Sequence, residues 1–273
     1  MKPEKILPLE LEKATSIYEM EKILGDLLRV VFLGTAGSMI TKTRTNISIL
    51  IDEDLLLDCG EGTTQKLLSI LENLSKIDNV LISHGHADHI NGLMSLLWAM
   101  WLVERRTKEL TITGPEYIES LVTSLLKLGY TPLDRLTFKI NYNFNPNFYE
   151  DIRITTTTHH PLNYAYRVER GKRSVCYTGD TGPCEKLVEF ARNCDLLIHE
   201  AAFPDELSDL AHTLNHSTPG DAGRVASRAK VKILALIHWP GIFEGNESIL
   251  IDQARKTFDG EIILAKDLDS LEV

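Results

Sequence analysis

The segment "SHGHADHING" (residues 83–92) restricts what this chain can fold into more than any other feature of its sequence. It holds three of the nine histidines of the chain and an aspartate: His84, His86, Asp88 and His89. It begins at the last residue of "DNVLIS" (residues 78–83), a segment with the composition of a buried strand. Burying four such side chains without partners would be costly, whereas imidazole nitrogens and carboxylate oxygens are ordinary ligands of zinc. The segment therefore predicts a metal site at the end of a strand.

More groups that can bind a metal or move a proton follow other predicted strands: Asp58, His159, Asp180, His199 with Glu200, and His238, with His216 opening the segment "HSTP". Because strands of one sheet end at a common edge, such groups can converge there. One catalytic zinc needs three or four N and O donors, so two zincs need more than the first loop supplies. His159, Asp180 and His238 complete the set, and the carboxylate of Asp180 can bridge two cations.

Asp58 has two interpretations. A ligating histidine usually donates its second N–H to a carboxylate, and Asp58 suits that supporting role. It could equally be a turn residue before Gly60.

The order of predicted elements favours two mostly separate β-sheets, each covered by helices. Strands are expected at 28–34, 46–51, 55–60, 78–83, 110–114, 151–160, 164–170, 174–180, 195–200 and 232–239, and helices at 62–77, 91–106, 115–129, 185–194 and 218–230. No Pro/Gly/Ser linker divides residues 29–273, which we expect to form a single domain. Residues 1–28 are expected to be an N-terminal helical arm that packs against the domain or contacts a second copy.

Composition narrows the class of protein. The formal net charge of −10 argues against wholesale nucleic-acid binding, although a local basic patch remains open. The four cysteines form no CxxC pair, which indicates buried thiols in a reducing compartment. The longest apolar run, 93–103, is too short to span a bilayer, and the amino terminus does not have the pattern of a signal peptide. We therefore expect a cytoplasmic protein with no membrane partner.

The "HGHADH" motif resembles the HxHxDH signature of the metallo-β-lactamase superfamily. That resemblance implies an α/β fold, the αββα sandwich of two mixed β-sheets flanked by helices, and a two-metal site. Six further segments are similar to ribonuclease Z and its relatives: "FLGTAGS", "KTRTN", "DCGEGTTQKLL", "TITGPE", "HEAAF" and "NHST". Together these segments cover the chain from about residue 29 to 239.

The resemblance also assigns roles to residues. It implies one zinc on His84, His86 and His159, a second on Asp88, His89 and His238, and Asp180 as the bridge. His159 is preferred to its neighbour His160 because its distance from Tyr166 matches the family spacing better, and His160 stays open as the alternative. The metals are expected to be two Zn²⁺, although Mn²⁺ or Fe accept the same ligands.

The expected activity is that of a dinuclear-zinc phosphodiesterase. A water shared by the metals would have its pKa lowered to about 7, so that hydroxide can attack phosphorus at neutral pH. Asp88 would orient this hydroxide, and His216, assisted by Glu200, would protonate the departing alkoxide. Lys42 and Arg44 would contact substrate phosphates, and the alternative for both is a solvated turn.

Two substrate classes remain open. The motif set favours a precursor transfer RNA cut at its 3′ end. Against it, the long basic arm common in the family has no room between His159 and Asp180, and "HWPGIF" departs from the usual family segment. The alternative is a small-molecule metallohydrolase of the cyclic nucleotide phosphodiesterase, lactonase or sulfatase type without an RNA substrate, and a metal-stabilised binding module is a third reading. The family often forms homodimers, so a homodimer is also expected.

Overall fold

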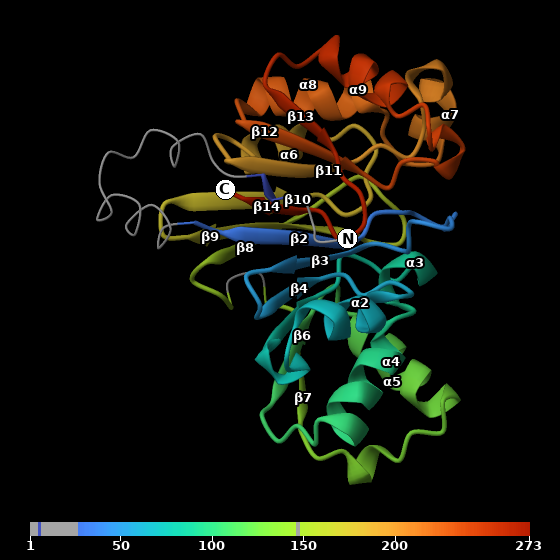
Figure 1. Ribbon diagram of the computed structural model, residues 1–273, viewed down its shortest axis with the longest axis vertical. Coiled ribbons are helices and arrows are strands. Elements are labelled where there is room, and N and C mark those ends of the chain that lie inside the picture. Colours follow the sequence, from blue (N-terminus) through green and yellow to red (C-terminus); the bar gives the residue numbers. More distant parts are fainter. Residues whose placement is uncertain (1–4, 7–26, 146–147) are drawn as a thin grey trace.

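Two mixed β-sheets pack face to face between two layers of helices (Figure 1). The computed structural model describes residues 5–6, 27–145 and 148–273. In Figure 1 the helices of the first half of the chain lie below the sheets and those of the second half lie above them. The expected αββα sandwich is confirmed.

The first sheet has eight strands in the order β1-β14-β2-β3-β4-β5-β6-β7. Its strands are β1 (Lys5–Ile6), β2 (Arg29–Gly34), β3 (Ser48–Ile51), β4 (Leu55–Leu57), β5 (Asn79–Leu81), β6 (Leu110–Thr113), β7 (Ile140–Asn143) and β14 (Ser270–Glu272). Strands β4 to β7 run parallel to one another, whereas β14, β2, β3 and β4 alternate in direction. The carboxyl ends of β4 and β5 therefore lie at one edge.

The second sheet has six strands in the order β13-β12-β11-β10-β9-β8. Its strands are β8 (Ile152–Thr156), β9 (Tyr164–Arg170), β10 (Arg173–Tyr177), β11 (Leu196–Glu200), β12 (Ile233–Ile237) and β13 (Glu261–Leu264). Strands β10 to β13 are parallel, and β8, β9 and β10 are antiparallel. The expected hairpin around "GKR" is present, since Arg170 pairs with Arg173.

Helices cover the outer face of each sheet. The first half contributes α2 (Thr63–Ile70), η2 (Leu74–Lys76), α3 (Ala87–Ile90), α4 (Leu93–Trp98), η3 (Ala99–Val103), α5 (Ile118–Leu128) and η4 (Leu133–Arg135). The second half contributes α6 (Glu185–Phe190), η5 (Asp205–Leu207), α7 (Ser208–Thr213), α8 (Pro219–Ala229), η6 (Gly241–Phe243) and α9 (Ser248–Arg255). In the described part of the chain, no helix has the length and apolar character that crossing a membrane requires.

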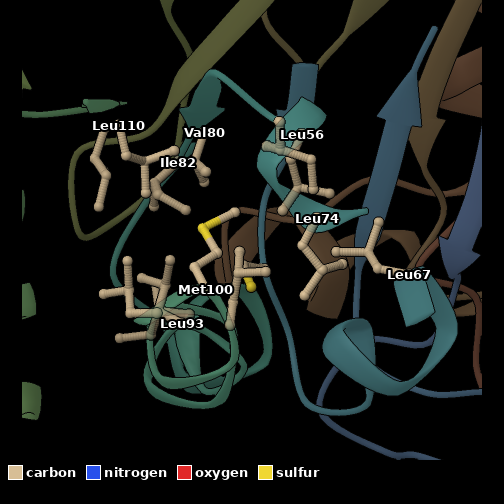
Figure 2. Packing of buried hydrophobic residues seen from close by; sticks show 14 of the residues in the cluster. Leu56, Leu67, Leu74, Val80, Ile82, Leu93, Met100 and Leu110 are labelled. Carbon is tan, nitrogen blue, oxygen red and sulfur yellow. The ribbon is translucent and has the colours of Figure 1, made fainter. Parts of the chain in front are cut away.

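Three apolar clusters stabilise these layers. One lies between the sheets and includes Phe32, Ile49 and Ile198. A second packs β5, β6 and α4 together, where Val80, Ile82, Leu93 and Met100 meet Leu56 and Leu110 (Figure 2). A third lies between the six-stranded sheet and α6, α8 and α9. Burying such side chains drives folding at roughly 25 cal/mol per Å² of apolar area, and it fixes the strand ends that carry the site.

Several expectations need correction. The helix expected at 62–77 stops at α2, and the side chain of Asn73 caps the separate turn η2 by accepting from Ser75 N–H. The expected helix 91–106 is α4 followed by the π-helical turn η3. Strand β7, and later α9, β13 and β14, lie in regions for which the sequence predicted no element. Within the expected arm, Lys5–Ile6 is a strand that pairs with β14, while residues 7–26 lie outside the described residues.

Candidate metal centre and proton-transfer pair

The polar groups of the site follow the carboxyl ends of neighbouring strands in both sheets. Asp58 follows β4, the loop from His84 lies between β5 and α3, and Asp180, Glu200 and His238 follow or end β10, β11 and β12. Because β4 is parallel to β5, and β10 to β12 are parallel, these ends lie at one edge of each sheet. The two sheets therefore bring residues far apart in sequence to one place.

The first ligand group consists of His84, His86 and His159, with Asp180 beside them. The Nε2 of His84 lies 3.0 Å from the Nδ1 of His86, and the Nε2 of His159 lies 3.3 Å from the same atom. The carboxylate of Asp180 lies 3.7 Å from the Nε2 of His84. His160 is exposed and does not belong to the group, so the structure brings His159 to the cluster.

The second ligand group consists of Asp88, His89 and His238. The Nε2 of His238 lies 3.2 Å from Asp88 and 3.4 Å from Oδ2 of Asp180. The Nε2 of His89 lies 3.4 Å from Oδ1 of Asp180. Asp180 thus lies between the two groups, as expected for a bridging carboxylate.

The donors fit divalent metal ions. The Nε2 of His89 is buried and has no hydrogen-bond partner among the described residues, although it faces two carboxylates. A buried ring nitrogen left unpaired in this way is costly unless it coordinates something. Three imidazoles in one group, and two imidazoles with a carboxylate in the other, match the N and O donors that zinc takes in catalytic sites.

The charges of the two groups differ. Burial, together with the neighbouring imidazoles, lowers the pKa of His84 well below its ordinary value, and burial also lowers the pKa of His86 and His159. These three rings are therefore neutral and can offer lone pairs. Burial would also lower the pKa of His89, but Asp180 and Asp58 raise it well above its ordinary value. The second group thus attracts positive charge, which a bound cation would supply in place of a proton.

Asp58 supports His89 from behind. Its Oδ2 accepts a hydrogen bond from the Nδ1 of His89 at 2.7 Å and another from the hydroxyl of Tyr177. Its Oδ1 accepts from the backbone N–H of Ser83, and its Oδ2 also accepts from the Ser83 hydroxyl. The geometry matches a carboxylate that orients a ligating histidine and not a simple turn residue.

Two of these residues have unusual backbone angles. Asp58 has φ +53° and His238 has φ +60°, both in the left-handed region that side chains with a Cβ rarely adopt. The backbone N–H of His238 donates to the carbonyl of Thr35 at 2.8 Å. The N–H of Asp58 donates to the carbonyl of Leu81 at the same distance. Each chain segment therefore turns sharply at its strand end, which directs the side chain into the site.

Glu200 and His216 form a hydrogen-bonded pair beside the ligands. The Nδ1 of His216 donates to Oε1 of Glu200 at 2.8 Å, since an ionised carboxylate can only accept. The other donors to Glu200 are the backbone N–H groups of Thr181, Ala202 and Ser217. Thr181 directly follows Asp180, so the same carboxylate is tied to the bridging residue.

The ring of His216 faces the metal ligands. It stacks on His238 at 5.6 Å between centroids and meets the edge of His159 at 5.1 Å. Burial would lower the pKa of His216, but Glu200 raises it to about 9. A pocket of about 140 Å³ opens beside His216 and is also lined by Ser38, Met39 and Phe203.

The two residues expected to contact phosphate lie in different environments. Lys42 is exposed on the loop after Gly37, where its expected role stays a prediction. Arg44 is only 2% exposed, and burial lowers its pKa to about 10. Its guanidinium donates to the carbonyls of Thr35 and Trp239 and lies 3.3 Å from the ring centroid of Trp239. This geometry does not support phosphate contact by Arg44, because all three guanidinium nitrogens already bond inside the protein.

Other residues around the site carried no expectation from the sequence. The hydroxyls of Tyr177 and Ser83 donate to Asp58, which supports His89. The side chain of Asn163 accepts from the backbone N–H of Asp180. Asp267 binds the backbone N–H groups of Thr35 and Thr45. His199 is different, since the sequence named it as a candidate donor: it lies in β11, is buried, and bonds through its Nδ1 to the carbonyl of Glu200, and it belongs to neither ligand group.

Comparison with known proteins identifies the family of the chain. Residues 53–239 match the Beta-lactamase superfamily domain. The chain is 31% identical to Ribonuclease Z of Thermoplasma acidophilum, over 90% of this chain and 96% of that one. It is 28% identical to Ribonuclease Z of Methanosarcina mazei, over 90% and 98%.

Solved structures show the same fold. The metallo-beta-lactamase fold protein YhfI from Bacillus subtilis superposes with a TM-score of 0.77 at 28% identity, covering 91% of this chain and all of that one. The short form of human tRNase Z superposes with a TM-score of 0.73 at 24% identity, over 89% of this chain and 98% of that one.

Proposed function

Since the chain belongs to the Beta-lactamase superfamily and, within it, to the relatives of ribonuclease Z, we propose that it cuts the phosphodiester at the 3′ end of precursor transfer RNA. Membership makes the protein a metal-dependent hydrolase of the phosphodiesterase type. The specific substrate, the number and kind of metal ions, and the roles of single residues are our proposal.

The pair of Glu200 and His216 carries this proposal. A metal-dependent hydrolase that expels an activated leaving group needs no acid beside its metals, whereas a ribose alkoxide is a poor leaving group that needs a proton. The structure has a histidine next to both ligand groups, held by a buried carboxylate. This arrangement supports cleavage of an unactivated phosphodiester.

The residues of the two ligand groups would hold two zinc ions. We assign His84, His86 and His159 to one ion, Asp88, His89 and His238 to the other, and Asp180 to both. When bound, the ions supply a nucleophilic oxygen at neutral pH and stabilise negative charge on the phosphoryl oxygens.

The side chains of the protein do the remaining work. Asp88, whose carboxylate accepts from Ser38 and His238, orients the attacking water. The new P–O bond forms as the bond from phosphorus to the ribose O3′ breaks. The Nε2 of His216 gives its proton to that O3′, so the product ends in a 3′-hydroxyl. Glu200 keeps His216 in the tautomer that presents Nε2 and stabilises the charge of the ring before the transfer.

One observation favours a smaller substrate. Strands β9 and β10 join through the two residues Gly171 and Lys172, so this hairpin carries no basic arm. An RNA would have to be held by other surfaces of a chain with net charge −10. A cyclic nucleotide or another small phosphodiester is therefore the second candidate.

The test uses purified, zinc-loaded protein and a transfer RNA precursor with a 3′ extension. We expect a single cut, with a 3′-hydroxyl on the transfer RNA and a 5′-phosphate on the released trailer. A cyclic nucleotide, bis(p-nitrophenyl) phosphate, a lactone and an aryl sulfate serve as parallel substrates. Cleavage of the small phosphodiesters without any cut in the RNA would replace the first candidate by the second, and activity only on the lactone or sulfate would overturn both.

A further inference from the structure

Tyr117 lies between β6 and α5, outside the ligand groups, and its hydroxyl joins two of their loops. The backbone N–H of Gly85, between His84 and His86, donates to the Tyr117 oxygen at 3.1 Å. The Tyr117 hydroxyl donates in turn to the carbonyl of Leu162 at 2.9 Å. Leu162 is in the loop between β8 and β9, which also carries His159, so one oxygen connects the two segments of the first ligand group.

The contact is close as well as polar. A Cβ on Gly85 would lie 3.0 Å from the ring of Tyr117, so the ring covers the residue between the two histidines. Burial raises the pKa of Tyr117 to about 12, which keeps its hydroxyl protonated at neutral pH. A phenol with one donor and an acceptor lone pair satisfies both partners at once.

The three imidazoles differ in how their rings are held. The Nδ1 of His84 bonds to the Ser83 hydroxyl at 3.1 Å, and the Nδ1 of His159 bonds to the carbonyl of Asn215 at 3.0 Å. His86 is exposed, and within the described residues its Nε2 has no hydrogen-bond partner. The position of His86 therefore depends on its backbone, which the bond to Tyr117 holds one residue earlier.

We propose that Tyr117 is a positioning residue that sets the spacing of His84, His86 and His159 by tying their loops together. The proposal rests on the metal centre of the proposed function. It concerns mainly one of the two cations, because the hydrogen bonds of the Tyr117 hydroxyl among the described residues go to Gly85 and Leu162, in the segments that carry His84, His86 and His159.

The variant Y117F removes the hydroxyl and keeps the ring. Y149F is the matched control, because the Tyr149 hydroxyl also makes two hydrogen bonds, to Thr113 and Asn79, away from the ligands. Both proteins are loaded with zinc and exposed to rising concentrations of a chelator, and the metal retained per chain is measured. For Y117F we expect one of the two equivalents to be released at about 10-fold lower chelator concentration, with the other unchanged.

A second readout uses the metal-free protein. We expect amide hydrogen exchange in the peptide containing Gly85 and His86 to be faster in Y117F than in the wild type, and unchanged in Y149F. Equal metal retention and equal exchange in Y117F and the wild type would overturn the proposal, as would a loss of both equivalents in both variants. If Y117F releases one equivalent while the wild type cuts no phosphodiester, the positioning role stands and the proposed function fails.

Discussion

The loop between β5 and α3 and the strand ends of the six-stranded sheet supply the same site by different means. The loop and the start of α3 bring His84, His86, Asp88 and His89 on six consecutive residues, and one carboxylate, Asp58, supports them. The six-stranded sheet brings single residues from separate strand ends, and each has its own anchor. The anchors include the Asn215 carbonyl for His159, Asn163 for Asp180 and Thr35 for His238.

The difference determines which substitutions disturb the ligand positions in each part. In the loop, the relative positions of the ligands follow mainly from local backbone geometry, so a distant change acts there through the few contacts that reach it, such as those of Asp58 and Tyr117. In the sheet, they follow from strand register and from contacts between loops that are distant in sequence. We therefore expect the second part to be sensitive to substitutions that touch no ligand, and four predictions test the comparison.

Asp180 follows β10 but lies between the two ligand groups, so its removal should have the largest effect. For D180A we expect activity to fall by more than about 10⁴-fold, because the activated nucleophile depends on both cations. Both metal equivalents should be lost in elemental analysis. D195A is the control, since Asp195 is a buried carboxylate at the opposite end of the same sheet, bonded to Ser174 and Lys232. If D180A retained two metals, Asp180 would not join the two ligand groups.

A substitution of His216 tests proton transfer separately from metal binding. For H216A we expect kcat on the RNA precursor to fall about 10³-fold while both metals are retained. The loss on bis(p-nitrophenyl) phosphate should be much smaller, because p-nitrophenolate leaves without a proton. E200Q should show the same split, with a smaller loss. An equal loss on both substrates would contradict the assignment of His216 as the acid.

Arg44 and Arg106 are two buried arginines that differ in what surrounds them. Each is 2% exposed and donates to backbone carbonyls. Arg44 differs in bonding to Trp239, which follows His238, and to Thr35, whose carbonyl accepts from the His238 N–H. We expect R44M and R106M each to lower the free energy of unfolding by about 1–3 kcal/mol, because buried carbonyls lose their donors. Only R44M should weaken metal retention, by about 10-fold, measured by chelator titration. Equal retention in both variants would show that the strand ends tolerate remote changes after all.

Asp221 is a carboxylate whose contribution to the free energy of unfolding should depend on pH. It caps α8, which follows His216, and it also bonds to His212. Burial would raise its pKa, but bonds from His212, Thr218 and Arg224 lower it below the usual 3.8. Because the folded-state pKa is depressed, its contribution is present above about pH 4 and is lost as the pH falls through the folded value.

We therefore expect D221N to lower the free energy of unfolding by about 1 kcal/mol at pH 7, with the difference shrinking toward pH 3. Urea unfolding at several pH values measures it. T218A removes the same cap without removing a charge, so its deficit should change less with pH. A D221N deficit that stays constant from pH 7 to pH 3 would contradict the titration of this carboxylate.

The sequence predicted the compact loop better than the scattered strand ends. Its ligands were recognisable because four polar side chains follow one apolar strand. The assignment of His159 over His160 needed family spacing, since both follow the same strand. The role of Arg44 could not be predicted, because its partner Trp239 follows a strand of the other sheet and is brought to it only by the packing of the two sheets.

Prediction of the fold from the sequence was limited in the same way. Strands with clear apolar alternation were predicted, including the hairpin of β9 and β10. Strand β7, "INYN", is the edge of its sheet and is half polar, so its pattern is close to that of a loop. Strand β14 has three residues and gains its stability from pairing with β2 and β1, which no local pattern indicates.

The left-handed backbone at Asp58 and His238 has a cost that the rest of the molecule must offset. Asparagine or glycine at these two positions would relax the main chain but would disable the side chains that the turns exist to present. Substitutions that stabilise the backbone at these two residues would therefore lower the activity. A more thermostable variant of this protein should therefore be sought by substitutions in the outer helices, with Asp58 and His238 kept unchanged.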